Sequence, residues 1–598
     1  MSLLKRLEVP EDSPLRNADA IPLPFPPTPS QSADESESEE ETLVRKPKET
    51  AGIKSSSLNE QVLDLTQDDE GDEVPMEATP EQLETLTLTL TLTPTSTLPL
   101  ILSRNMESPS RPLSLYFLPF LSPGHMIPLF EMSRLFSARG HRVTIITTPA
   151  NAQLLHTTIS KDSSSGHPIS AHTFPFPSKQ VGLPDGIENL FNVYDIDTAT
   201  KIHTGMHLLR EKIEQFITAN PPDCIFSDMF HPWTADLAIK LRIPRIVFHA
   251  TCIFAMSLKD SMRKPDSPHL SVQSDDEPFL IPGLPHPITM TKSELPDYVR
   301  TPNGYAQLME QFREAELKSY GVLVNNFYEL ESDYCEHYKK TMGHKVFHVG
   351  PAALIHRNAA EQADRVHKAV VGEHECLSFL NSKKPNSVLY VCFGSACIFP
   401  NDQLMELASG IEASGHQFIW VVFGKEENEE EEEKNKWLPK GFEERTKGKG
   451  MIIRGWAPQV LILDHPSVGG FLTHCGWNSV IEGISAGLPL ITWPLYAEHF
   501  YNEKLVTQAL GVGVEVGKKD WNLWIDAGKN VVRRENIEAA VRRVMDSGDP
   551  AAEMMREKAK MLGEMAHKAV KEGGSSHRNL TVLIEELEQL RDQKVKGN

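Results

Sequence analysis

The segment WAPQVLILDHPSVGGFLTHCGWNSVIEGISAGLPLITWPLYAEH, from Trp456 to His499, decides the fold of this chain. An apolar run ending at Thr473 predicts a buried strand, and a helical pattern begins near Ser479. Gly476, between the two, lets the backbone approach a ligand closely. The free backbone amides around Asn478 point out of the helix N-terminus, which favours binding of a diphosphate.

Side chains of the same segment complete a nucleotide site. His474 can donate to a phosphate oxygen, and Glu482 lies one turn into the helix, where it can accept from ribose hydroxyls. Trp456 offers an aromatic face to a base, and Gln459 can pair with a base or ribose edge. Each residue alone is more often structural. Together, in this order on strand, turn and helix, they predict a nucleoside-diphosphate site.

The alternation of short apolar runs with helical patterns begins near Pro112 and continues to the C-terminus. It predicts an α/β fold with two doubly wound parallel-sheet domains that face each other across a cleft. The expected strands include 115–121, 143–148, 224–226, 245–249, 387–393, 418–422, 451–453, 470–473 and 490–493, and the expected helices include 126–137, 234–240, 403–414, 479–485 and 502–510.

The domain boundaries follow from shifts in composition. We expect a disordered acidic extension at 1–110, an N-terminal domain at 111–353, a polar and Ala-rich linker at 354–375, and a C-terminal domain at 376–598 that contains the nucleotide site. The last helix is expected to pack back on the N-terminal domain. The run of seven glutamates and one asparagine from Glu426 to Glu433 has no apolar stripe, which predicts a solvated loop.

The extension differs sharply from the rest of the chain. Residues 1–105 contain 21 acidic and 8 basic side chains and lack Trp and Tyr, so they offer little apolar surface to bury. Val62–Thr66, followed by Asp68, Asp69 and Glu70, resembles a SUMO-interacting motif, but a solvated acidic tail with a few leucines is the favoured interpretation. The segment is also compatible with a translated leader, with Met106 as the start.

Two residues that follow or end predicted strands form a candidate general base and its orienting partner. His125 follows the first strand of the body at the mouth of a helix, whose positive end is expected to keep the imidazole neutral. Asp228 ends another strand, 103 residues later, so both side chains can reach one crevice. We expect Asp228 to orient His125 as a general base.

The 456–502 segment resembles the signature box of plant family-1 UDP-dependent glycosyltransferases, and the resemblance runs from about Pro112 to the C-terminus. It implies a GT-B fold, with the acceptor bound mainly by the N-terminal half and the UDP-sugar by the other. By this resemblance Trp456 stacks on uracil, Gln459 and Glu482 hold the nucleoside, and Ser395 lies beside the phosphates. The full implied donor site is Ser395, Trp456, Ala457, Gln459, His474, Gly476, Trp477, Asn478, Ser479, Glu482, Glu498 and His499; within it, His474, Asn478 and Ser479 hold the diphosphate, and Trp477, Glu498 and His499 face the sugar.

The donor sugar and the acceptor stay open. His499 stands where most family members have Gln, and histidine there accompanies galactose use in some relatives, so galactose and glucose are both expected donors. The flanking sequence resembles the branch acting on triterpenoid sapogenins and flavonoids, nearest to soyasapogenol glucuronide galactosyltransferases. This implies a saponin intermediate as acceptor, with flavonoids and phenolics as alternatives. An alternative of another class is a non-catalytic UDP-sugar-binding or SUMO-binding adaptor.

Composition bounds the remaining properties. The net charge of −22 argues against a general binder of nucleic acid or anionic membranes. Seven scattered cysteines give no disulfide framework, which favours a reducing, cytoplasmic location. No Cys pair and His pair combine into a zinc motif, and the nucleotide segment from Trp456 to His499 contains no Asp-x-Asp that would hold magnesium against a diphosphate. We therefore expect no metal and no cofactor besides the UDP-sugar co-substrate, no membrane span, and a monomer.

A chain that starts at Met106 is expected to fold and to retain full transferase activity, because residues 1–105 are predicted to bury little surface. Thermal unfolding and turnover, measured on both chain lengths, check this. A large fall in the unfolding midpoint of the shorter chain contradicts the prediction.

Overall fold

The computed structural model describes residues 111–191, 193–301, 303–355, 373–426, 429–523 and 530–597. The predicted extension at 1–110, with its SUMO-interacting motif, lies outside these residues, as does most of the predicted linker. Helix α11 (Glu373–Asn381) starts two residues before the predicted end of that linker. In the described residues no helix is both long and apolar enough to cross a membrane.

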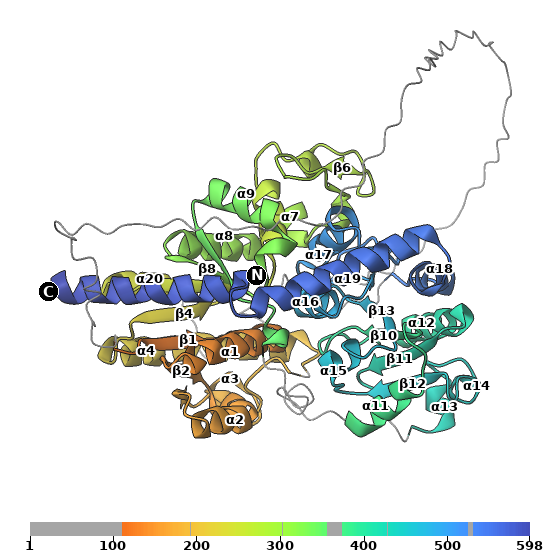
Figure 1. Ribbon diagram of the computed structural model, residues 1–598, viewed down its shortest axis with the longest axis horizontal. Helices are drawn as coiled ribbons and strands as arrows, with labels where there is room; N and C mark the ends of the chain where they lie inside the picture. Colours follow the sequence, from red (N-terminus) through yellow and green to blue (C-terminus); the bar gives the residue numbers. More distant parts are fainter. Residues whose placement is uncertain are drawn as a thin grey trace, which may run out of the picture. The chain divides into compact units, whose positions relative to one another are not determined.

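Two separate parallel sheets form the body of the chain, which confirms the predicted fold class (Figure 1). The seven-stranded sheet has the order β3 (Ile169–Thr173), β2 (Arg142–Thr147), β1 (Ser114–Leu118), β4 (Cys224–Asp228), β5 (Arg245–His249), β8 (Gly321–Val324) and β9 (Lys345–His348). The six-stranded sheet has the order β12 (Gly450–Arg454), β11 (Gln417–Val422), β10 (Val388–Cys392), β13 (Val468–Thr473), β14 (Leu490–Thr492) and β15 (Gly513–Glu515).

Both strand orders reverse in the middle of the sheet. In the first sheet β1 lies between β2 and β4, and in the second β10 lies between β11 and β13. At such a switch point the connections leave toward opposite sides, which opens a crevice beyond the carboxyl ends of the two central strands. The topology therefore directs the loops after β1, β4, β10 and β13 toward ligands.

Helices cover the sheets. The N-terminal half contains α1 (Pro123–Ala138), α2 (Pro149–Ser164), α3 (Ser178–Val181), α4 (Ile196–Ala219), α5 (Trp233–Leu241), α6 (Ile253–Met262), α7 (Asp297–Arg300), α8 (Gly304–Leu317) and α9 (Ser332–Met342), and a small hairpin of β6 (Phe279–Leu280) and β7 (Thr289–Met290). The C-terminal half contains α11, α12 (Asn401–Ser414), α13 (Glu431–Lys434), α14 (Phe442–Arg445), α15 (Gln459–Leu463), α16 (Trp477–Ser485), α17 (His499–Lys504), α18 (Arg534–Met545), α19 (Pro550–Val570) and α20 (Ser575–Gly597).

Local sequence explains the two helices that matter most for the site. Helix α1 starts with Pro123 at its first turn, where a fixed φ suits the helix, and Gly140 (φ 84°) follows its end. Helix α16 buries Val480, Ile481 and Ile484 at helical spacing against the sheet. The acidic run partly contradicts the loop prediction: Glu431 to Glu433 open α13, where carboxylates favour a helix N-terminus.

The last helix returns to the N-terminal half. Helix α19 packs on α16 of the C-terminal half, and α20 then lies against β9 of the first sheet (Figure 1). Leu580, Leu583 and Leu587 of α20 are buried in one apolar cluster with Phe117 of β1 and Phe226 of β4. The core of the N-terminal half therefore includes residues from the far end of the chain.

A buried ion cluster joins the two halves. The Lys504 ammonium at the end of α17 lies 3.0 Å from Glu294 of the N-terminal half, 3.3 Å from Glu503 and 3.0 Å from Glu515. Burial raises the pKa of Glu503 to about 8, although the charge of Lys504 opposes this shift. Burial opposes the charge of Lys504, but the surrounding carboxylates outweigh it and raise its pKa.

Replacing Lys504 with Met is expected to lower the free energy of unfolding by about 3–5 kcal/mol, because it leaves buried carboxylates without their cation. Lys519→Met is the matched control: this ammonium lies 3.9 Å from Glu294 and 3.8 Å from Glu515, but its side chain is 54% exposed, so about 0–1 kcal/mol is expected. Urea unfolding of both variants checks this, and equal effects contradict it.

Candidate active site

The switch point of the first sheet brings His125 and Asp228 together. Because β1 and β4 are neighbours, the helix after β1 and the end of β4 meet at one crevice, and His125 Nδ1 lies 2.8 Å from Asp228 Oδ2. The imidazole ring is held edge-on against the rings of Phe120 and Phe230, with centroid distances of 5.3 Å each. Its Nε2 is thereby left as the nitrogen that can take a proton from a ligand.

The electrostatics of this pair differ from the expectation based on the helix end. Burial alone would lower the pKa of His125, but the charge and hydrogen bond of Asp228 outweigh burial, and the pKa is raised. Burial alone would raise the pKa of Asp228, but His125 and the backbone N–H of Phe230, which donates at 3.1 Å, lower it. Asp228 is therefore an ionised, fully buried acceptor for His125 Nδ1–H, and the carboxylate, not the helix end, sets the basicity of the ring.

The switch point of the second sheet gathers the predicted donor residues. A cavity of about 310 Å³ is lined by all twelve residues predicted for the donor site and by His125. Ser395 follows β10 and His474 follows β13, as the strand order requires. Gly394 has φ 72°, and a side chain there would approach His474 to within 2.7 Å, so glycine is required at this position.

The nucleoside end of this cavity is pre-arranged by hydrogen bonds. Gln459 Nε2 donates to Glu482 Oε2 at 2.8 Å and to Ser479 Oγ at 3.2 Å. Tyr390 donates to Gln459 Oε1 at 3.4 Å. Trp456 and Ala457 lie in the loop before α15 and line the same cavity. These contacts hold the Gln459 amide and the Glu482 carboxylate in the cavity that the Trp456 indole also lines. Hydrogen-bonding groups together with an aromatic ring suit a nucleoside.

Two neutral histidines lie at the other end. Burial lowers the pKa of His474 to about 4 and that of His499 well below its ordinary value, and their rings are in edge contact at 4.9 Å. His474 Nδ1 is buried without a hydrogen-bond partner among the described residues. His499 Nδ1 accepts from the backbone N–H of Tyr496 at 3.5 Å, which leaves Nε2 as its donor. Both rings can therefore donate to ligand oxygens without adding charge.

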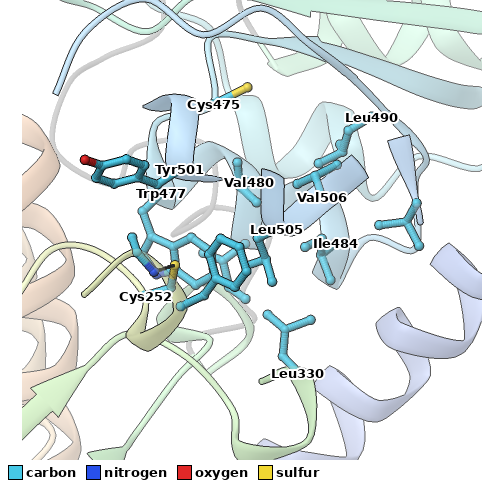
Figure 2. Close-up of a cluster of buried hydrophobic side chains, with 14 of the residues drawn as sticks. Cys252, Leu330, Cys475, Trp477, Val480, Ile484, Leu490, Tyr501, Leu505 and Val506 are labelled. Carbon is cyan, nitrogen blue, oxygen red and sulfur yellow. Dashed lines mark hydrogen bonds between the residues drawn. The ribbon is translucent and has the colours of Figure 1, made fainter. Parts of the chain in front are cut away.

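Two predicted ligand contacts differ in the structure. Trp477 lines the cavity, but its indole is 2% exposed and packs among core residues including Cys252, Leu330 and Tyr501 (Figure 2). Its Nε1–H donates to Asn325 O at 2.9 Å, so this side chain joins the two halves.

The side chain of Asn478 is likewise engaged between the halves. It donates to Gly124 O at 2.8 Å and accepts from Asn325 Nδ2 at 3.3 Å. The group that Asn478 still offers a phosphate is therefore its backbone N–H, at the second position of α16. Asn325, just after β8, was not singled out from sequence. Its signal is a pair of asparagines directly after an apolar strand.

A second cavity, of about 320 Å³, adjoins the donor cavity at His125. It is lined by His125 and Glu498, which also line the donor cavity, and by many apolar side chains. Sequence did not identify these residues, because they come from α4, α6 and α8 and from loops of both halves. The apolar lining includes Phe120, Val193, Met229, Phe230, Met256, Met309, Phe312 and Trp521. His125 therefore lies at the junction of two cavities, of which the donor cavity has the more polar lining and the second the more apolar lining.

One group of metal-ligand types is found away from both cavities. Glu331, Cys335 and His348 are buried, with ligand atoms within 4.8 Å of one another. Glu331 accepts from the backbone N–H groups of Ile253 and Phe254 at 2.9 and 2.7 Å and from Asn326, and Cys335 Sγ lies 3.0 Å from His348 Nε2. Glu331 therefore anchors the start of α6 through backbone hydrogen bonds, and Cys335 is paired with His348.

Comparison with known proteins identifies the family. Residues 124–536 match the family model of UDP-glucoronosyl and UDP-glucosyl transferases. The chain is 62% identical over 490 residues to UDP-glucosyl transferase 73CC6 of Saponaria officinalis, covering 81% of this chain and 98% of that protein. It is 46% identical to soyasapogenol B glucuronide galactosyltransferase of Glycine max, covering 82% and 98%.

Solved structures agree with this result. The crystal structure of Glycyrrhiza uralensis UGT73P12, complexed with glycyrrhetinic acid 3-O-monoglucuronide, superposes with a TM-score of 0.76 at 44% identity, covering 81% of this chain and 98% of that one. The two parallel-sheet domains of this chain therefore have the GT-B fold. This chain belongs to the plant family-1 UDP-glycosyltransferases.

Proposed function

We propose that the enzyme transfers a hexose, galactose or glucose, from a UDP-sugar to a hydroxyl of a plant specialised metabolite, with inversion at the anomeric carbon. The observation that carries this proposal is the position of His125, which is bonded to Asp228 and lines both cavities. A base at that junction touches an acceptor hydroxyl in one cavity and faces the sugar of a donor in the other.

The chemistry is a direct displacement. The acceptor hydroxyl gives its proton to His125 Nε2 while its oxygen attacks C1 of the hexose, and the bond between C1 and the diphosphate oxygen breaks. Asp228 keeps Nδ1 protonated and stabilises the imidazolium that forms. UDP leaves from the face opposite the attacking oxygen, which inverts the anomeric configuration.

The leaving diphosphate is stabilised by groups of this chain. The N-terminus of α16 presents the backbone N–H groups of Trp477, Asn478 and Ser479, and its dipole favours negative charge. His474 Nδ1 and Ser395 complete the proposed phosphate contacts, since both line the same cavity. We propose that this arrangement makes the reaction independent of a divalent metal.

A triterpenoid saponin intermediate is the proposed acceptor. The apolar lining of the second cavity suits a rigid hydrocarbon skeleton. Two relatives point the same way: one is named for a soyasapogenol B glucuronide, and another is solved with glycyrrhetinic acid 3-O-monoglucuronide. A flavonoid or phenolic acceptor is the alternative, because a 45% identical relative from Fragaria ananassa is named as a flavonoid 3-O-glucosyltransferase.

Replacing His125 with Ala is expected to lower turnover about 10²–10⁴-fold, as for other general bases, while UDP binding measured by calorimetry is retained. Asp228→Asn is expected to lower turnover and also to move the acid limb of the pH–rate profile to lower pH. The sign follows because Asp228 raises the pKa of His125, and burial alone lowers it. Turnover of His125→Ala above a tenth of wild type shows that another residue is the base.

His499→Gln is expected to shift donor preference from UDP-galactose toward UDP-glucose. His499 lines the donor cavity beyond His474, where the hexose would lie, and one misplaced hydrogen bond to a hydroxyl changes discrimination by about 1–3 kcal/mol. The ratio of kcat/KM for the two donors, measured with one acceptor, isolates this effect because acceptor contacts cancel. An unchanged ratio means that His499 does not read the hexose.

A further inference from the structure

One part of the apolar acceptor cavity is lined by charged side chains. They come from two neighbouring helices, α6 and α8, and they differ in kind from the aromatic and methionine side chains that line most of the cavity. The charged residues of this part are Lys259, Asp260 and Arg263 of α6 and Arg313 and Glu316 of α8.

The carboxylates in this part already have donors. Glu316 lies 2.9 Å from His249 Nε2 and accepts from the hydroxyl of Tyr338. Asp260 lies 3.7 Å from Arg313 Nε. Just behind the lining, Glu310 pairs with Arg263 and lies 3.8 Å from the second arginine, Arg313. The negative charges are therefore largely compensated before any ligand enters.

Lys259 has no such partner. Its Nζ is 3.1 Å from Met309 Sδ, and a thioether is a weak acceptor for an ammonium group. Within the described ranges, no carboxylate oxygen lies within 4.0 Å of Nζ. Nearby, the Nε–H of Arg313 is buried without a hydrogen bond. Lys259 thus lines the cavity as a cationic donor with capacity to spare, whereas Arg313 lies beside Asp260 and Glu310.

The surroundings of Lys259 change its pKa. The pKa of Lys259 is lowered to about 8: burial is the main cause and Arg263 adds to it, while the charges of Glu316 and Glu498 oppose the shift without restoring the ordinary value. An ammonium held partly out of water without an anion is unfavourable, and a ligand carboxylate would relieve it.

We propose that Lys259 binds a carboxylate carried by the acceptor, so that the preferred acceptor is an acid: a uronide or a triterpenoid acid. The proposal rests on the proposed function and names the substrate class of that same site. Lys259 and His125 line one cavity, so a single acceptor that fills it can present a hydroxyl to the base and a carboxylate to the ammonium. A carboxylate on the donor is not the target, since Lys259 does not line the donor cavity.

Matched acceptors test this inference. One pair is a triterpenoid 3-O-glucuronide and its 3-O-glucoside, which differ only in carboxylate against hydroxymethyl; the other is a triterpenoid acid and the corresponding primary alcohol. Wild type is expected to prefer the acid of at least one pair by about 10- to 100-fold in kcat/KM. Lys259→Met is expected to abolish that preference, and Lys259→Arg to retain most of it.

Lys240→Met is the matched control, because Lys240 lies on α5 with its side chain 65% exposed, outside the lining of the cavity, and its change leaves the preference intact. Binding is measured in parallel, with UDP present, by quenching of the fluorescence of Trp521, which lines the cavity. Equal affinity and equal turnover of acid and neutral partners in wild type overturn the inference while transfer itself stands. Equal losses on both partners in Lys259→Met also overturn it.

Failure of the proposed function has a different signature. If no acceptor receives a hexose but the acids still bind more tightly and lose that advantage in Lys259→Met, the carboxylate site is supported and the transfer chemistry is wrong. Binding and turnover therefore report on the two proposals separately.

Discussion

The site depends on the contact between the end of β8 and the start of α16. Trp477 donates to Asn325 O, and the side chains of Asn325 and Asn478 meet beside the first turn of α1. This contact holds the carboxyl edge of one sheet against that of the other, so that two half-sites share one space. His125 of one half and the N-terminus of α16 of the other half therefore line the same cavity.

Two of the histidines that line the donor cavity are uncharged. His474 and His499 are kept neutral by burial, so they can donate hydrogen bonds without attracting counter-ions. In the pair of His125 and Asp228 burial is outweighed, and a proton-accepting ring is supported by an ionised carboxylate. The charged cluster around Lys504 is structural, because it ties the two halves together.

The features predicted best from sequence are the strands of the parallel sheets and the residues at their carboxyl ends. Continuous apolar runs locate most strands to within a few residues, and the rule that ligands bind at carboxyl ends brings His125 to Asp228 and Ser395 to His474. It does not say which way a side chain turns after the strand ends, so Trp477 and Asn478 were assigned to ligand although their side chains join the halves. The lining of the acceptor cavity could not be predicted from sequence for a similar reason. Lys259 and Met309 meet because α6 and α8 pack together, and hydrophobic periodicity does not predict which helices pack together.

The position of α20 has a consequence for how the protein is made. The core of the first domain includes Leu580, Leu583 and Leu587, which the ribosome adds after nearly everything else. During synthesis the N-terminal sheet therefore emerges with an uncovered apolar face and keeps it until the whole second domain has been translated. Domains that form first along a chain normally fold first. Here the earliest domain is the last to be completed, and for that interval its exposed face is the part of the nascent chain most in need of a chaperone.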